Sequence, residues 1–178
     1  MNKHIKKLTI CGIFAAIICV VTTFVAIPAP AIGSINLGDI FILCSAWLLG
    51  PWGALASGIG ASLADIFSGF AIYAPATLVI KATMALSCYY SFFLFVRLIK
   101  DGRIGNILSR LLSALIAEGV MILGYFAYES IIYGVSMAIA SIPFNLIQGS
   151  VCFIVGTAVC HLLMQSTAIK RLLIEQTK

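Results

Sequence analysis

Long apolar runs fill almost the whole chain and leave only short polar stretches between them. Of its 178 residues, 62% are hydrophobic and 10% are charged, which is too little polar material to cover a soluble domain of this size. A membrane-spanning helix needs about 20 apolar residues, so six helices and their loops use up the full length. The sequence therefore predicts an all-α integral membrane protein, with residues 1–178 forming one compact six-helix transmembrane domain.

Basic residues mark one side of the predicted membrane. Ten of the eleven Lys and Arg lie at the N-terminus, around one central loop or in the tail, and Lys81 alone falls inside an apolar run. By the positive-inside rule, this bias predicts that both termini and the central loop are cytoplasmic. The net charge of +5 is then explained by flanks that orient the helices and meet the anionic lipid bilayer, with no need for nucleic acid. The N-terminal segment imitates a signal peptide, but its apolar run is long enough to span, and we expect an uncleaved first helix.

Apolar runs and turn residues predict helices over residues 8–27, 38–49, 53–67, 75–96, 107–128 and 143–164. Pro28 and Pro30 are expected to end the first helix, and residues 29–37, 69–74 and 131–142 to form outer connections. The helix at 38–49 is short for a full span, so we expect it to be tilted or packed within the bundle. The helix at 53–67 carries small residues every four positions, which lets neighbouring helices approach closely on several sides.

Five charged residues are left unexplained by the rule that orients the helices: Asp39, Asp65, Lys81, Glu118 and Glu129. Ionisable groups in a membrane are costly and usually functional. Polar residues converge on the outer half of the predicted bundle, whereas the inner half is almost purely apolar. This asymmetry predicts a pocket open to the outside and argues against a continuous pore, which needs polar lining throughout.

The candidate substrate-binding residues are Lys81, Glu118, Tyr125, Asn145, Gln148, Tyr73 and Asp65. Structural interpretations stay open for several of them. Lys81 could neutralise Asp65 or Glu118, and the two amides could only join helices. Asp39 suits a helix N-terminus, and Glu129 is interpreted as a solvated charge at the end of a loop.

Motifs for catalysis and cofactor binding are missing from the sequence. The six cysteines form no CxxC pair and no cysteine–histidine cluster with zinc spacing, and no nucleophile–base motif or phosphate-binding loop is present. We therefore expect no metal, no cofactor, no enzyme activity and no ATPase in this chain. A stand-alone channel or facilitator for small solutes is the second hypothesis, and a membrane-embedded enzyme is the third.

Several segments resemble the S components of energy-coupling factor (ECF) transporters. They are Asn36-Leu37-Gly38-Asp39, the run from Leu49 to Gly60 (LGPWGALASGIG), Ala64-Asp65, Tyr73-Ala74-Pro75-Ala76-Thr77 and Ile80-Lys81. The resemblance implies a multi-pass protein of the bacterial cytoplasmic membrane that captures a vitamin with high affinity. It implies a T coupling protein and two ATP-binding-cassette ATPases as partners, and delivery of the vitamin by toppling of the S component within that complex.

The same resemblance places the substrate in the outer half, with residues 29–37 as a lid over it. It also implies that small residues of the first helix meet the T protein, for which Gly12, Ala15 and Ala16 are the candidates. One Lys, one Glu, two amides and tyrosines suit a small, polar ligand that carries a ring or a carboxylate. The nearest-looking subgroup handles pyridoxine, hydroxymethylpyrimidine or pantothenate.

Overall fold

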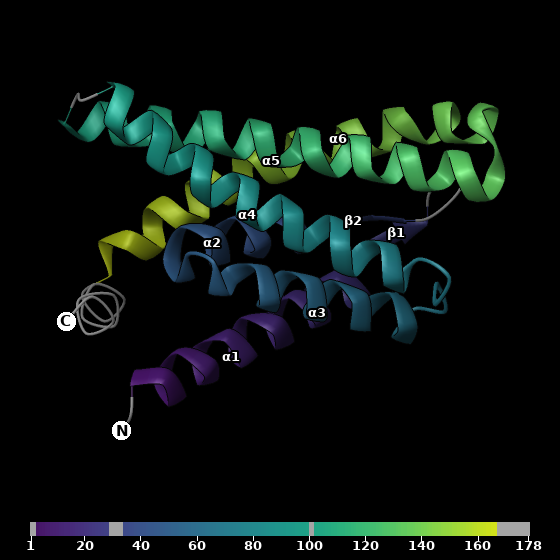
Figure 1. The fold of residues 1–178 in the computed structure, drawn as a ribbon, viewed down its shortest axis with the longest axis horizontal. Helices are drawn as coiled ribbons and strands as arrows, with labels where there is room; N and C mark the ends of the chain where they lie inside the picture. The colour runs from purple at the N-terminus through teal and green to yellow at the C-terminus, as the bar shows by residue number, and fades with distance from the viewer. Residues whose placement is uncertain (1–2, 29–33, 100–101, 167–178) are drawn as a thin grey trace.

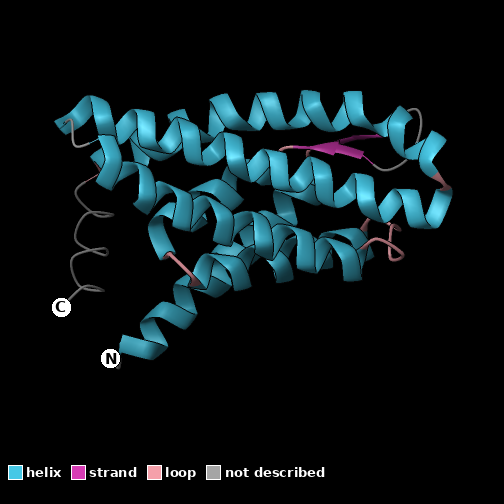
Figure 2. Cartoon of the chain, turned by 45° about the horizontal axis from the view of Figure 1, so that its top comes forward, coloured by secondary structure: helices cyan, strands magenta, loops and turns pink. Residues whose placement is uncertain are grey.

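The computed structural model describes residues 3–28, 34–99 and 102–166, which form six helices and one short β-hairpin (Figures 1 and 2). The helices are α1 (Lys3–Phe24), α2 (Gly38–Leu49), α3 (Trp52–Phe67), α4 (Ala74–Ile99), α5 (Gly102–Tyr133) and α6 (Val135–Gln165). The prediction of six helices is confirmed. Four of them, α1, α4, α5 and α6, are long and apolar enough to cross a membrane.

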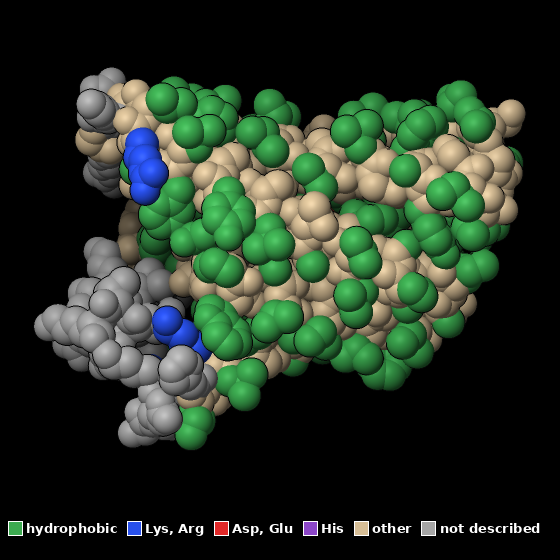
Figure 3. Space-filling model, in the orientation of Figure 1, with side chains coloured by type: hydrophobic (Ala, Val, Ile, Leu, Met, Phe, Trp, Pro, Cys, Tyr) green, Lys and Arg blue, Asp and Glu red, His purple; other side chains and the backbone are tan. Residues whose placement is uncertain are grey.

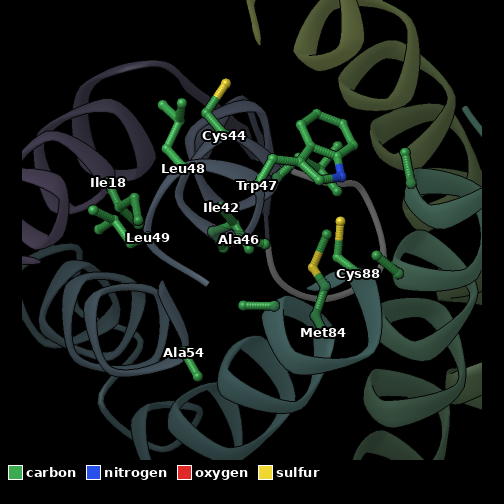
Figure 4. Packing of buried hydrophobic residues seen from close by; sticks show 14 of the residues in the cluster. Ile18, Ile42, Cys44, Ala46, Trp47, Leu48, Leu49, Ala54, Met84 and Cys88 are labelled. Carbon is green, nitrogen blue, oxygen red and sulfur yellow. The ribbon is translucent and has the colours of Figure 1, made fainter. Parts of the chain in front are cut away.

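The short helix α2 lies in the middle of the structure. Eleven of its twelve residues are buried, and it packs against α1, α3, α4 and α6. Figure 4 shows Ile42, Trp47 and Leu48 of α2 between Ile18 of α1 and Met84 of α4. The indole of Trp47 donates to Ser113 Oγ of α5 at 3.1 Å, so its buried N–H is satisfied. A helix surrounded by other helices does not need the full length of a span, which explains why twelve residues suffice.

Small residues of α3 allow three neighbouring helices to come close. A Cβ added at Gly60 would lie 2.4 Å from the carbonyl oxygen of Ala15 in α1, and one at Gly58 would lie 2.8 Å from that of Leu78 in α4. At Gly53 the added atom would lie 2.7 Å from the backbone of Ser45 in α2. The predicted close approach on several sides of this helix is therefore confirmed.

We expect Gly60→Ala to lower the free energy of unfolding by about 1–3 kcal/mol, because a methyl group there meets rigid backbone and forces α1 away from α3. Gly119→Ala is the matched control, since a Cβ at Gly119 of α5 meets nothing within 4 Å and Ala is the better helix former. Thermal melts in detergent compare the two variants. Equal melting temperatures for both would contradict this account of the α1–α3 contact.

The end of the structure that carries the hairpin differs from the prediction in two places. The first helix ends at Phe24 and not near Ile27; β1 (Ala26–Pro28) then pairs in antiparallel fashion with β2 (Ser34–Asn36), and Ile27 lies opposite Ile35. The hairpin satisfies backbone groups that a further helical turn would otherwise have bonded. Residues 29–33, which belong to the predicted lid, lie outside the described residues.

The predicted outer connection at 131–142 is wrong. Residues up to Tyr133 continue α5, Gly134 makes the turn at φ +86°, and α6 begins at Val135. Pro143 lies inside α6 and does not begin it. Contacts with α5 hold this first part of α6 in place, which local sequence signals for a helix start do not report.

The sides of the structure are apolar, as a membrane protein requires. Large exposed side chains such as Leu8, Leu94, Leu123 and Leu162 face outward from α1, α4, α5 and α6. On the face that Figure 3 shows, hydrophobic side chains cover the length of the helices, and Lys and Arg lie at one end. That end carries the start of α1 and the end of α6, opposite the hairpin (Figure 1).

Candidate functional site

A network of buried polar side chains joins five elements below the β-hairpin. Lys81 Nζ of α4 lies 2.5 Å from Asp39 Oδ1 of α2, and the two side chains are 4% and 1% exposed. Gln148 of α6 donates from Nε2 to Asp39 Oδ2 at 2.6 Å, while its Oε1 accepts from the backbone N–H of Asn36 at 2.9 Å. Gln148 therefore ties strand β2 to the ion pair.

The network continues from Lys81 into α5. The ammonium nitrogen lies 5.3 Å from the centre of the Tyr125 ring, within the range of a cation–π contact. The Tyr125 hydroxyl in turn lies 3.0 Å from Thr77 Oγ1 of α4. Asp39 thus does more than cap a helix: it is the partner of Lys81, and the two predicted partners, Asp65 and Glu118, are not.

A cavity lies beside this network, toward the hairpin. Its lining comes from β2, α3, the turn after α3, α4, α5 and α6: Ser34, Asn36, Asp65, Phe70, Tyr73, Thr77, Tyr125, Glu129, Phe144, Asn145 and Gln148. Its volume is about 40 Å³, room for a few water molecules. A ligand that carries a ring would therefore enter only if the walls move apart.

Five of the seven predicted substrate-binding residues line this cavity: Asp65, Tyr73, Tyr125, Asn145 and Gln148. Lys81 and Glu118 do not. Glu118 is 3% exposed, lies against Gly149 of α6, and has no hydrogen-bond partner for either carboxyl oxygen within the described part of the chain. It precedes Tyr125 by seven residues, or about 10 Å along α5, so it lies farther from the end of α5 than the residues that line the cavity.

Glu129 is not the solvated charge that the sequence suggested. It is 3% exposed, it lines the cavity, and it accepts hydrogen bonds from Tyr73 Oη at 3.4 Å and from Ser141 Oγ of α6. Its burial follows from the continuation of α5 and α6 past the predicted loop. The sequence did hold a signal, because Glu129 lies on the same helical stripe as Glu118 and Tyr125.

Aromatic side chains gather around Tyr73 in the wall of the cavity. Its ring centre lies 5.6 to 6.5 Å from those of Phe70, Tyr125, Tyr128 and Tyr133, distances typical of aromatic pairs. Tyr128 also donates from its hydroxyl to the backbone carbonyl of Ile72. The cavity thus combines an aromatic wall with carboxylate and amide groups, as small-molecule sites do.

The proposed docking residues in α1 differ in exposure. Gly12 and Ala16 are exposed, and nothing lies within 4 Å of a Cβ placed at Gly12. Ala15 is half-buried, since its backbone packs against Gly60 of α3. Gly12 and Ala16 are four residues apart and so share one open face of the helix.

A family model and two relatives match most of this chain. The family model described as "ECF-type riboflavin transporter, S component" matches residues 2–165. The "Uncharacterized protein in gap 3'region" of Pyrococcus woesei is 34% identical over 150 residues, which cover 82% of this chain and 93% of that protein. The thiamine precursor transporter HmpT of Lactococcus lactis subsp. cremoris (strain MG1363) is 30% identical over 169 residues, which cover 91% of this chain and 90% of HmpT.

A solved structure of the S component of a bacterial ECF transporter has the same fold. The likeness has a TM-score of 0.66 at 22% identity and covers 91% of this chain and 97% of that one. At this identity the likeness shows the arrangement of the helices and no residue roles.

Proposed function

Because this chain belongs to the ECF-type riboflavin transporter S component family, we propose that it is the substrate-capture subunit of an ATP-driven importer. It binds a small micronutrient from outside the cell with high affinity. The family is described as riboflavin transporter S components, whereas one relative is a thiamine precursor transporter. Membership in this family therefore does not by itself determine the substrate.

The cavity beside the Lys81–Asp39 pair is the observation that carries this proposal. Five of the seven side chains chosen from the sequence alone line it, and strand β2 closes over it through the bond from Asn36 to Gln148. Breaking that bond and moving the hairpin would widen the cavity. In this proposal the hairpin formed by β1 and β2 acts as the lid.

The aromatic lining supports a ring-bearing ligand, such as pyridoxine or hydroxymethylpyrimidine. The relative HmpT is a thiamine precursor transporter, which supports a ligand of the same kind for this chain. The third candidate, pantothenate, has a carboxylate and no aromatic ring. It would therefore make weaker contacts with the rings around Tyr73.

Transport requires partners in this proposal. The sequence has no phosphate-binding loop, so a T coupling protein and two ATP-binding-cassette ATPases supply the energy. Gly12 and Ala16 form the docking face on α1, because small exposed residues let a partner helix approach closely.

We propose that both termini are cytoplasmic, with the protein in the bacterial cytoplasmic membrane. Two observations support this orientation. Basic residues lie at both ends of the sequence, and the start of α1 and the end of α6 lie at the same end of the structure (Figure 1). Single cysteines added at positions 2 and 178 of a cysteine-free variant should react with membrane-impermeant reagents only after the cells are opened. Labelling of either position on intact cells would contradict this orientation.

Mass spectrometry of the purified protein tests the function. A capture subunit with a slow off-rate should carry a small molecule in stoichiometric amount through purification in detergent, and adding that molecule back should raise the melting temperature. A channel binds its solute weakly and would carry none. A membrane-embedded enzyme would convert the retained molecule, so the appearance of a product would contradict the capture role.

A further inference from the structure

We propose that this cavity selects an amino-substituted, protonatable nitrogen heterocycle and rejects anionic ligands, with Asp65 and Glu129 as the residues that make this choice. The inference rests on the proposed function, since it concerns the substrate of the same site. The sign of the charge that the cavity can accept distinguishes the candidate ligands from one another.

The ionisable groups that line the cavity are both acidic, apart from the tyrosines. Asp65 comes from the last turn of α3 and Glu129 from the last turns of α5. The described lining residues include no Lys, Arg or His. Since a carboxylate wall attracts positive charge and repels negative charge, this lining favours a cation over an anion.

Lys81 does not reverse this sign. Its ammonium group lies 2.5 Å from Asp39 Oδ1 in an ion pair whose Lys81 side chain is 4% exposed, so the charge is neutralised locally, and Lys81 does not line the cavity. An anionic ligand would have to take Lys81 away from Asp39 and would leave that carboxylate buried with Gln148 as its remaining partner. Leaving a buried charge without its counter-ion is strongly unfavourable.

Two lining residues have polar atoms that need a partner. Asp65 Oδ2 and Asn145 Nδ2 are shielded from solvent and bond to none of the residues that the structure describes. Gln148, by contrast, already uses its amide oxygen on Asn36 and its amide nitrogen on Asp39. A ligand that satisfies the site must therefore supply a hydrogen-bond donor to Asp65 and an acceptor to Asn145.

The rings along the cavity favour a flat cation further. Phe70, Tyr73, Tyr125 and Phe144 line it, and the faces of such rings attract positive charge. An amino group beside a ring nitrogen presents two N–H groups to a carboxylate when the ring is protonated. This pairing is bidentate and charge-assisted, which makes it one of the stronger hydrogen-bond arrangements in proteins.

Glu129 supplies the second negative charge from the outer side. It is buried, and its bond from Tyr73 is long at 3.4 Å, so the Tyr73 hydroxyl is only weakly held there. Ser141 of α6 keeps the carboxyl in place. Glu129 therefore acts on the ligand through its field, whereas Asp65 bonds to it directly, and we expect the smaller loss of affinity at Glu129.

Titration calorimetry on the full chain in lipid nanodiscs tests the inference. The probes are hydroxymethylpyrimidine, its analogue with hydrogen in place of the amino group, and pantothenate. The proteins are the wild type, Asp65→Asn, Glu129→Gln and the control Tyr90→Phe, whose side chain is exposed outside the cavity. Melting curves establish that each variant is folded.

We expect the wild type to bind hydroxymethylpyrimidine and not pantothenate. Asp65→Asn should weaken that binding about 10- to 100-fold, the range of one charge-assisted hydrogen bond. The analogue without the amino group should bind the wild type and Asp65→Asn almost equally, because it lacks the group that donates a hydrogen bond to Asp65. Tyr90→Phe should change none of these affinities.

Other outcomes would overturn the inference in one of two distinguishable ways. Tight binding of pantothenate, or equal losses with and without the amino group, would refute selection by charge and leave the capture function standing. If none of the three probes binds and no small molecule is retained through purification, the capture function fails and this inference fails with it.

Discussion

Replacing Lys81 with methionine should lower the free energy of unfolding by about 3–5 kcal/mol, the usual effect of removing one partner of a buried ion pair. The change leaves the Asp39 carboxylate, which is fully buried, without its counter-ion. It also removes the cation from the Tyr125 ring. Since Asp39, Lys81 and Gln148 join α2, α4 and α6, the loss should be seen as earlier melting of the whole domain.

Two variants separate the ion pair from a general effect of lost charge. Arg97→Met removes an exposed cation near the end of the same helix and should change the stability by no more than about 0.5 kcal/mol. Adding Asp39→Asn to Lys81→Met should recover part of the loss, because the carboxylate that was left unpaired becomes neutral. Wild-type melting of Lys81→Met would show that the pair does not hold these helices together.

Replacing Ala16 with tryptophan should abolish uptake in cells that contain the complete transporter and leave ligand binding by the purified protein unchanged. Ala16 is exposed on α1, on the face it shares with Gly12 and away from the cavity lining. A large ring there would hold off a partner helix that needs small side chains to approach. Position 15 is a poorer test, because the backbone of Ala15 packs on Gly60.

Leu123→Trp is the matched control for the docking experiment. Leu123 is 68% exposed on α5, so the same ring is added to an outward-facing position of another helix. Both variants should reach the membrane in equal amounts. Wild-type uptake by Ala16→Trp would place the docking surface elsewhere, and a loss of uptake by both variants would point to a general defect of the membrane protein.

Helix positions were largely predictable where apolar runs and turn residues agree. The helices at 38–49 and 53–67 begin and end within one residue of the prediction, and Pro75 lies in the first turn of α4 as expected. The hairpin and the helical continuation past residue 128 were missed. Both depend on contacts between distant segments, such as Ser141 with Glu129, which local propensity does not contain.

The choice of the ion-pair partner shows a second limit of sequence reasoning. Asp39, Asp65, Glu118 and Glu129 could be selected from the sequence because each is an acid in or near an apolar segment. Which of them meets Lys81 depends on how α2 turns against α4 in the interior. The position of Asp39 in the first turn of a helix was enough to explain an acidic residue there. The sequence therefore gave no reason to expect its ion pair with Lys81.

Transport by proteoliposomes tests the central claim most directly. Vesicles that contain this protein alone, with ATP inside, should bind the small molecule identified by mass spectrometry and accumulate none of it. Vesicles that also contain the T coupling protein and the two ATPases should accumulate the same molecule against its gradient in the presence of ATP. Sustained uphill accumulation by this protein alone would contradict its assignment as a capture subunit.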